Sequence, residues 1–312
     1  MPLETSHPRT PEFSIIIAVY NDWGPLEGCL ESLNDQDTSA PFEVIVVDDG
    51  SEQSAPEAIR QRKGSLSLSF LRQEHTGTAA ARNRGVKESN GEILVFTDAD
   101  CRFQPKCLSV LASVIRSSPQ HNCFQLHLTG DSSNLVGRAE ELRLLAIQDR
   151  MVQENGCIRY LNTSGFAIRR SHRSVQGAQL FDPLALRGED TLLLATLIRG
   201  GELPLFVSSA TVQHSISLPL AGCFRKDIHA AWLEGRTYNT IAASGVSIRM
   251  KNRERLRMLV STWRIARQHS LGTLAWIVLV LRQILERTVS FIYNAMHPPC
   301  AGPADTTARP KL

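Results

Sequence analysis

Several features that identify common protein classes are missing from this 312-residue sequence. Its seven cysteines include no Cys-x-x-Cys pair, which argues against both a disulfide framework and a zinc site. No apolar run approaches the roughly 18 residues of a membrane-spanning helix, since the longest, Leu271 to Leu281, stops at Arg282. The net charge of +3 is too small to indicate nucleic acid as a partner.

The common phosphate-binding loops are missing as well. The chain has neither the Gly-x-Gly-x-x-Gly spacing of dinucleotide-binding proteins nor a Walker loop, which argues against nicotinamide enzymes and P-loop NTPases. The first twelve residues hold three prolines and no apolar stretch, so we expect no signal peptide. Together with the cysteine pattern, this favours a reducing, cytoplasmic location.

The first hundred residues alternate apolar runs with helix-like stretches. Runs typical of buried strands are Phe13–Val19, Phe42–Val47, Leu66–Leu71 and Ile93–Phe96, and the helix-like stretches between them are 24–35, 54–63 and 78–89. This order predicts an α/β fold of three layers, with a mainly parallel sheet between helices. Residues 101–215 alternate less regularly, and the chain beyond 220 is helix-like.

Acidic side chains follow three of these predicted strands at the points where the strands end. They are Asp22, the pair Asp48 and Asp49, and the pair Asp98 and Asp100. Because the carboxyl ends of parallel strands meet at one edge of a sheet, we expect these carboxylates to gather there. They would repel one another without a cation, so a divalent ion carrying a phosphate is indicated. For each segment alone, an ordinary acidic turn is the alternative.

Two predicted helix starts carry charged residues. Gly77 precedes a helix with small side chains, where Arg82 could offset the charge of a diphosphate, although close helix packing is the alternative. Glu189 and Asp190 open a second, apolar helix, as acidic residues commonly do. We expect the helix dipole and Arg187 to keep Asp190 ionised, which suits a general base.

Six segments occur in order along the chain: 14–21 (SIIIAVYN), 46–51 (VVDDGS), Gly77 with 81–85 (ARNRG), 96–100 (FTDAD), 165–170 (GFAIRR) and 188–190 (GED). Together they resemble family 2 glycosyltransferases with the GT-A fold. The resemblance implies transfer of a sugar from a UDP-, GDP- or dTDP-sugar to a glycan or lipid-linked acceptor. It also implies Mg²⁺ or Mn²⁺ as cofactor and inversion at the anomeric carbon.

The resemblance further implies which residues take part. Asp190 would be the general base, and Asp100 and His214 would hold the metal ion. Ala18, Tyr20 and Asp49 would line the pocket for the base and ribose of the donor. The other substrate-binding residues would be Gly77, Arg82, Asp98, Ala99 and Glu189.

The resemblance also divides the chain into regions. A flexible N-terminus (1–12) precedes a catalytic domain (13–215) made of a nucleotide-binding half (13–100) and an acceptor half (101–215). A helical extension (216–296), with helix-like stretches at 222–243, 253–268 and 272–294, and a disordered, proline-rich tail (297–312) follow. The Gln-x-x-Arg-Trp motif of processive synthases is absent, which argues for addition of one sugar or a few.

The helical extension carries a marked positive charge. Residues 246–270 hold seven Lys or Arg and one acid, and an amphipathic apolar helix follows. A helix packed on the sheet beside a solvated basic face is the simpler interpretation. The sharper one is a peripheral contact of 246–294 with anionic lipid on the inner face of the cell membrane.

Two other functions remain open from the sequence. A nucleotidyltransferase that makes the activated sugar would use a similar sheet, but the loop after the first strand, 20–25, has no lysine and a single glycine, so it fits the expected glycine-rich, lysine-bearing loop poorly. A non-catalytic module that binds a sugar nucleotide is the second alternative, against which Asp98, Asp100 and Asp190 argue.

Overall fold

The structure is a computed structural model that describes residues 10–61, 66–177, 179–215, 218–243 and 252–297. Its strands are β1 (Phe13–Val19), β2 (Phe42–Asp48), β3 (Ser67–Arg72), β4 (Ile93–Asp98), β5 (Cys101–Phe103), β6 (Cys123–Gly130), β7 (Phe166–Arg169) and β8 (Leu205–His214). Its helices are α1 (Trp23–Asn34), α2 (Glu57–Arg60), α3 (Thr78–Glu88), α4 (Cys107–Ser117), α5 (Leu135–Met151), the 3₁₀ turn η1 (Thr163–Gly165), α6 (Arg173–Gln176), α7 (Glu189–Arg199), α8 (Leu220–Ala243), α9 (Asn252–Gln268) and α10 (Thr273–Met296).

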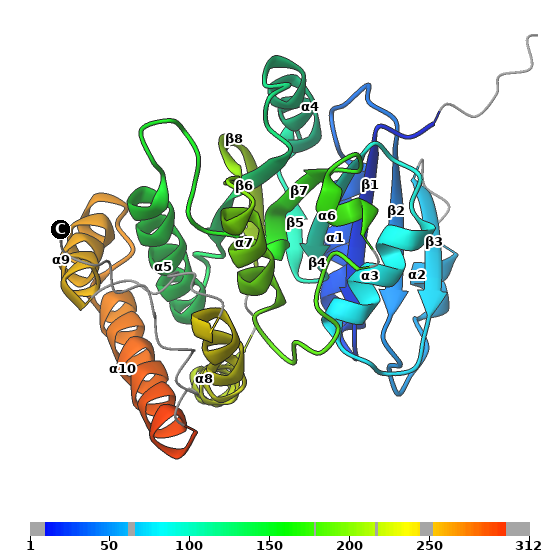
Figure 1. Ribbon diagram of the computed structural model, residues 1–312. Helices are drawn as coiled ribbons and strands as arrows, with labels where there is room; N and C mark the ends of the chain where they lie inside the picture. Colours follow the sequence, from blue (N-terminus) through cyan, green and yellow to red (C-terminus); the bar gives the residue numbers. More distant parts are fainter. Residues whose placement is uncertain (1–9, 62–65, 178, 216–217, 244–251, 298–312) are drawn as a thin grey trace, which may run out of the picture.

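The strands form an eight-stranded sheet in the order β3-β2-β1-β4-β7-β6-β8-β5 (Figure 1). Four of its seven strand pairings are parallel, and they include all the pairings among β1 to β4. The α/β fold with a mainly parallel sheet is therefore confirmed. The helix expected at 54–63 is shorter than predicted, since α2 spans only Glu57–Arg60.

Helices cover both faces of the sheet, as the continuous apolar runs predict. In β1, Ile15 and Ile17 belong to a core cluster with Leu30 of α1 and with side chains of α4. Ile16 points to the opposite face, where it joins a second cluster with Leu194 of α7. A strand buried on both faces carries mostly apolar residues, which explains why β1 shows no polar alternation.

The predicted functional edge of the sheet is formed by the ends of β1, β2 and β4. Ala18 near the end of β1 is level with Val47 on one side and with Asp98 on the other. His214 at the end of β8 pairs with Cys101 of β5, directly after the Asp98–Asp100 segment. The register thus brings the acidic segments and His214 to the same edge.

Helices α9 and α10 pack on α5 instead of directly on the sheet, and α8 packs mainly against α10. Ala139 and Leu142 of α5 share a buried cluster with Leu271, Val278 and Leu279. Figure 1 shows α5 between β6 and the pair formed by α9 and α10. No helix of the described residues is long and apolar enough to cross a membrane.

The expected ends of the chain lie largely outside the described residues. Residues 1–9 and 298–312 are not described, so the flexible N-terminus and disordered tail stay predictions. The six cysteines of the described ranges are all free and buried.

We predict that Gly85→Ala lowers the free energy of unfolding. A Cβ at Gly85 of α3 would lie 2.4 Å from Cγ2 of Ile16, whose β-branched side chain is fully buried. Overpacking of this kind costs about 1–3 kcal/mol, which exceeds the gain in helix propensity of about 1 kcal/mol. Urea unfolding measures the change, and Gly24→Ala in α1, where nothing lies within 4 Å, is the control. Equal stability of both variants would contradict the packing argument.

Candidate active site

A buried arginine connects the two halves of the site. Arg82 of α3 is 2% exposed, and its Nη2 lies 2.7 Å from Oδ1 of Asp98 at the end of β4. Its Nη1 is paired with Glu189, the first residue of α7. Burial alone would lower the pKa of Arg82, but the two carboxylates raise it, so the charge is kept. The sequence predicts that Arg82 offsets the charge of a diphosphate, whereas in the structure both of its terminal nitrogens contact protein carboxylates.

Asp98 is fixed by a second partner from the acceptor half. Its Oδ2 accepts a hydrogen bond of 2.7 Å from the hydroxyl of Ser164 in η1. Burial alone would raise the pKa of Asp98, but Arg82 and Ser164 hold it below its ordinary value. Sequence analysis did not identify Ser164, because the serine directly before the recognisable Gly165 has no distinguishing pattern.

The two predicted metal ligands lie side by side. Nε2 of His214 is 3.2 Å from Oδ2 of Asp100. Burial alone would lower the pKa of His214, but the hydrogen bond and charge of Asp100 raise it above its ordinary value. The Sγ of Cys101 lies within 4.8 Å of both ligand atoms, but burial raises its pKa well above the ordinary value and keeps it a thiol. Imidazole and carboxylate are suitable ligands for Mn²⁺, so Asp100 and His214 fit a divalent cation.

A further carboxylate, Asp22, reaches the same place from the loop after β1. Burial raises the pKa of Asp22, and the negative charges of Asp100 and Asp98 raise it further, while Lys226 of α8 opposes them. The sequence predicts Asp22 among the carboxylates that gather at this edge, but does not single it out as a metal ligand. Mutual repulsion among these carboxylates favours a bound cation.

Asp49 organises the loop that leads into α3. Its Oδ1 accepts hydrogen bonds from Nε2 of Gln73 and the amide of Thr76, at 2.8 and 3.0 Å. Its Oδ2 accepts from the amide of Gly77 at 2.8 Å and lies 2.9 Å from Nδ1 of His75. Gly77 has φ of +99°, which favours glycine at this turn. Both carboxylate oxygens of Asp49 are therefore engaged by the protein.

The predicted pocket for the nucleobase contains the exposed aromatic ring of Tyr20. Tyr20 is 46% exposed and stacks on His75, with ring centroids 4.1 Å apart. Ala18 is half-buried beside them at the end of β1. The methyl group of Ala99 is instead buried in the core, so any contact of Ala99 with a substrate is left to its backbone.

Asp190 lies in the first turn of α7, next to the arginine bridge. Its Oδ1 accepts hydrogen bonds from the amide and hydroxyl of Thr191, at 2.6 and 3.1 Å. Burial, followed by the charge of Glu189, raises the pKa of Asp190 to about 7. The expectation that the helix dipole and Arg187 keep Asp190 ionised is wrong, because burial raises the pKa and Nε of Arg187 instead faces Glu234 at 3.6 Å. A carboxyl group with this pKa can accept a proton near neutral pH.

Solved structures define the class of this fold. The mannosyltransferase PcManGT from Pyrobaculum calidifontis, in complex with GDP-Man and Mn²⁺, superimposes with a TM-score of 0.60 at 17% identity, over 92% of this chain and 87% of that chain. S. aureus TarS 1-349 in complex with UDP gives 0.54 at 19% identity, over 91% and 92%. The fold is that of GT-A glycosyltransferases.

The sequence comparisons name the family. Residues 14–174, more than half of the chain, match Glycosyl transferase family 2, and the chain belongs to this family. Glycosyltransferase AglE of Haloferax volcanii is 39% identical over 94 residues, which are 29% of this chain and 31% of AglE. The matched part is thus less than a third of that relative.

We predict that Arg82→Met destabilises the protein by about 3–5 kcal/mol, because it leaves Asp98 and Glu189 without their buried partner. Chemical unfolding measures this change. Arg84→Met is the matched control on the same helix, since Arg84 donates a hydrogen bond to the carbonyl of Arg72 near the surface. A loss no larger than that of the control would show that the bridge contributes little.

Proposed function

We propose that the protein is a non-processive, inverting glycosyltransferase that moves a sugar from a nucleotide-sugar to an acceptor hydroxyl. The observation that carries the proposal is the bridge from Asp98 through Arg82 to Glu189. It joins the strand end that precedes Asp100 to the helix start that holds Asp190. This bridge supports a single site in which Asp100 would serve the cation and Asp190 the base, each in its own environment.

Each group has a distinct task in this mechanism. Asp100 and His214 would hold Mg²⁺ or Mn²⁺, which when bound neutralises the charge of the leaving diphosphate. Because Oδ1 of Asp190 is engaged by Thr191, its Oδ2 takes the proton of the acceptor hydroxyl. That hydroxyl attacks the anomeric carbon from the face opposite to the leaving group. Tyr20 offers a stacking surface for the nucleobase.

Several observations support a nucleoside-diphosphate sugar as donor. Among proteins of the same fold, PcManGT binds GDP-Man and TarS binds UDP. We propose a UDP-, GDP- or dTDP-sugar for this chain, and a glycan or lipid-linked sugar as acceptor. Analysis of the released product tests this reaction, since a glycosyltransferase would release a nucleoside diphosphate. A nucleotidyltransferase would release pyrophosphate, and a binding module would release neither.

We predict that Asp190→Asn lowers kcat by about 10²–10⁴-fold, because the general base is lost, while nucleotide affinity is kept. In the wild type, activity should rise with pH as Asp190 loses its proton around its pKa of about 7. Initial rates across pH 5.5–8.5, with about half-maximal activity near pH 7, test both points. Near-normal turnover of the variant would remove Asp190 from the mechanism.

We predict that Asp100→Ala weakens binding of UDP or GDP in the presence of Mn²⁺ by tenfold or more, about 1.4 kcal/mol, since one metal ligand is lost. Titration calorimetry with and without Mn²⁺ measures the effect. Asp35→Ala, at an exposed position after α1, is the control. Unchanged metal-dependent affinity would exclude Asp100 as a ligand.

We also propose that α9 and α10 contact the surface of an anionic membrane. Both helices expose large apolar side chains away from α5, among them Val260, Trp263, Leu274, Ile284 and Phe291, which is 75% exposed. The exposed charged side chains described on these helices are all arginines: Arg257, Arg264, Arg267 and Arg287. Helices that expose both apolar and basic side chains suit a contact with anionic lipid.

We predict that the double variant Ile284→Gln/Phe291→Gln floats less with anionic vesicles than the wild type, because apolar side chains no longer enter the lipid interface. Ile228→Gln on α8, which removes an exposed isoleucine from another helix, is the control. Equal flotation of all three proteins would contradict the contact. A dimer that gel filtration shows for the wild type but not for the double variant would also contradict the contact. The apolar face of α10 would then bind a second copy of this chain.

A further inference from the structure

Helix α8 touches the turn that begins the catalytic helix α7. The hydroxyl of Thr237 donates a hydrogen bond of 2.5 Å to the carbonyl of Arg187. Thr237 is only 5% exposed, and its Cγ2 is 3.1 Å from the position of a Cβ at Gly188. Gly188 has φ of +78° and directly precedes α7, so Thr237 contacts the turn at the point that fixes the start of this helix.

A second residue of α8 holds the same turn. Oε1 of Glu234, one helical turn before Thr237, lies 3.6 Å from Nε of Arg187. One bond therefore engages the backbone of residue 187 and the other its side chain. The first hydrogen bond of α7, from the amide of Leu192 to the carbonyl of Gly188, follows directly. Asp190 lies within this first turn.

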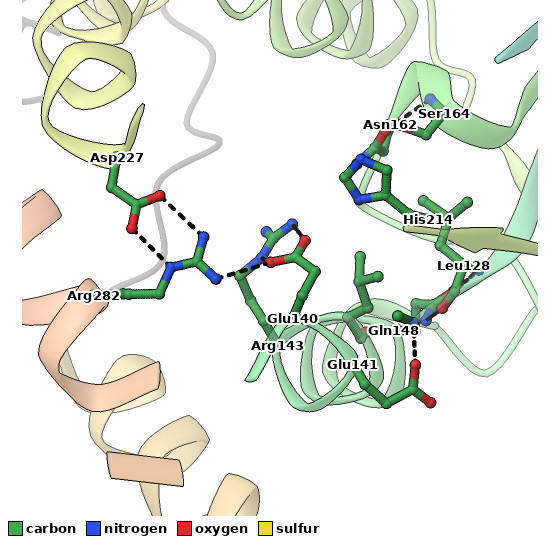
Figure 2. Close-up of polar contacts among 12 residues, drawn as sticks. Leu128, Glu140, Glu141, Arg143, Gln148, Asn162, Ser164, His214, Asp227 and Arg282 are labelled. Carbon is green, nitrogen blue, oxygen red and sulfur yellow. Dashed lines mark hydrogen bonds and ion pairs between the residues drawn. The ribbon is translucent and has the colours of Figure 1, made fainter. Parts of the chain in front are cut away.

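Helix α8 is in turn fastened by a buried ion network, drawn in Figure 2. Arg282 of α10 makes a bidentate pair with Asp227 of α8, with distances of 2.7 and 3.0 Å. Its Nη1 also lies 3.2 Å from Oε2 of Glu140 on α5, and that oxygen accepts a 3.0 Å bond from Nε of Arg143. Because buried charges separate only at high cost, this network holds α8 against α10 and, through Glu140, to α5.

We propose that Thr237 is a positioning residue that sets Asp190 through the turn at Arg187 and Gly188. This inference rests on the proposed function, in which Asp190 is the base. It makes the helical extension a part of the catalytic apparatus. A displaced carboxylate loses its alignment with the acceptor hydroxyl, and a shift of about 1 Å can cost about 100-fold in rate.

The decisive variants change Thr237 with little change in volume. Thr237→Val removes the hydroxyl and keeps the shape, so kcat should fall by about tenfold or more. The affinity for UDP or GDP with Mn²⁺ should stay within about twofold, because the donor site is untouched. Thr237→Ser keeps the hydroxyl and should restore most of kcat. Thr240→Val is the matched control, since the hydroxyl of Thr240 is exposed and bonds Arg236 of its own helix.

Amide hydrogen exchange gives a second measurement that needs no acceptor. Thr237→Val should speed exchange in a peptide covering residues 187–193 by about fivefold or more, whereas the serine variant and the Thr240 control should match the wild type. Unchanged exchange, or a kcat equal to that of the wild type, would overturn the proposal. Loss of nucleotide binding together with a lower Tm would also contradict it, by showing a merely structural role.

The two proposals fail in different ways. Wild-type protein that turns over no nucleotide-sugar would count against the proposed function. The exchange rates of the 187–193 peptide would still decide whether Thr237 holds the start of α7.

Discussion

The site depends on one buried positive charge, that of Arg82. Removing a guanidinium from water is costly, and the contacts with Asp98 and Glu189 offset that cost only when both elements are in place. The arginine therefore requires the end of β4 and the start of α7 to meet over α3. Since Asp100 follows the end of β4 and Asp190 lies at the start of α7, the same ion pairs bring together the segments to which we assign the metal ligand and the base.

At the predicted cation site, by contrast, the carboxylates of Asp22 and Asp100 repel each other. Asp22 and Asp100 lie close enough for the charge of Asp100 to raise the pKa of Asp22, while Lys226 opposes that shift and His214 lies 3.2 Å from Asp100. This arrangement favours a cation over an empty site. Away from this edge, the network around Arg282 is fully paired, which suits a support for α8 more than a binding site.

The sequence predicts the first half of the fold well, because a strand such as β1, buried on both faces, leaves a continuous apolar run. It predicts the second half less well, since β6 pairs with β8 across a long stretch of chain and with an irregular register at Leu126. The contacts within the site are equally non-local. Arg82 meets Glu189 across 107 residues, and the pKa of Asp190 depends on burial, so no local pattern could reveal either.

The most direct test of the central claim is a thermal-shift screen of the wild-type protein against UDP, GDP, dTDP and CMP, each with and without Mn²⁺. A ligand at a hundred times its Kd adds about 2.7 kcal/mol to the free energy of unfolding, which is easily measured. We expect one of the nucleoside diphosphates to raise Tm, and to do so more strongly with Mn²⁺. No shift with any nucleotide, with or without the metal, would contradict the account of a nucleotide-sugar site at this edge of the sheet.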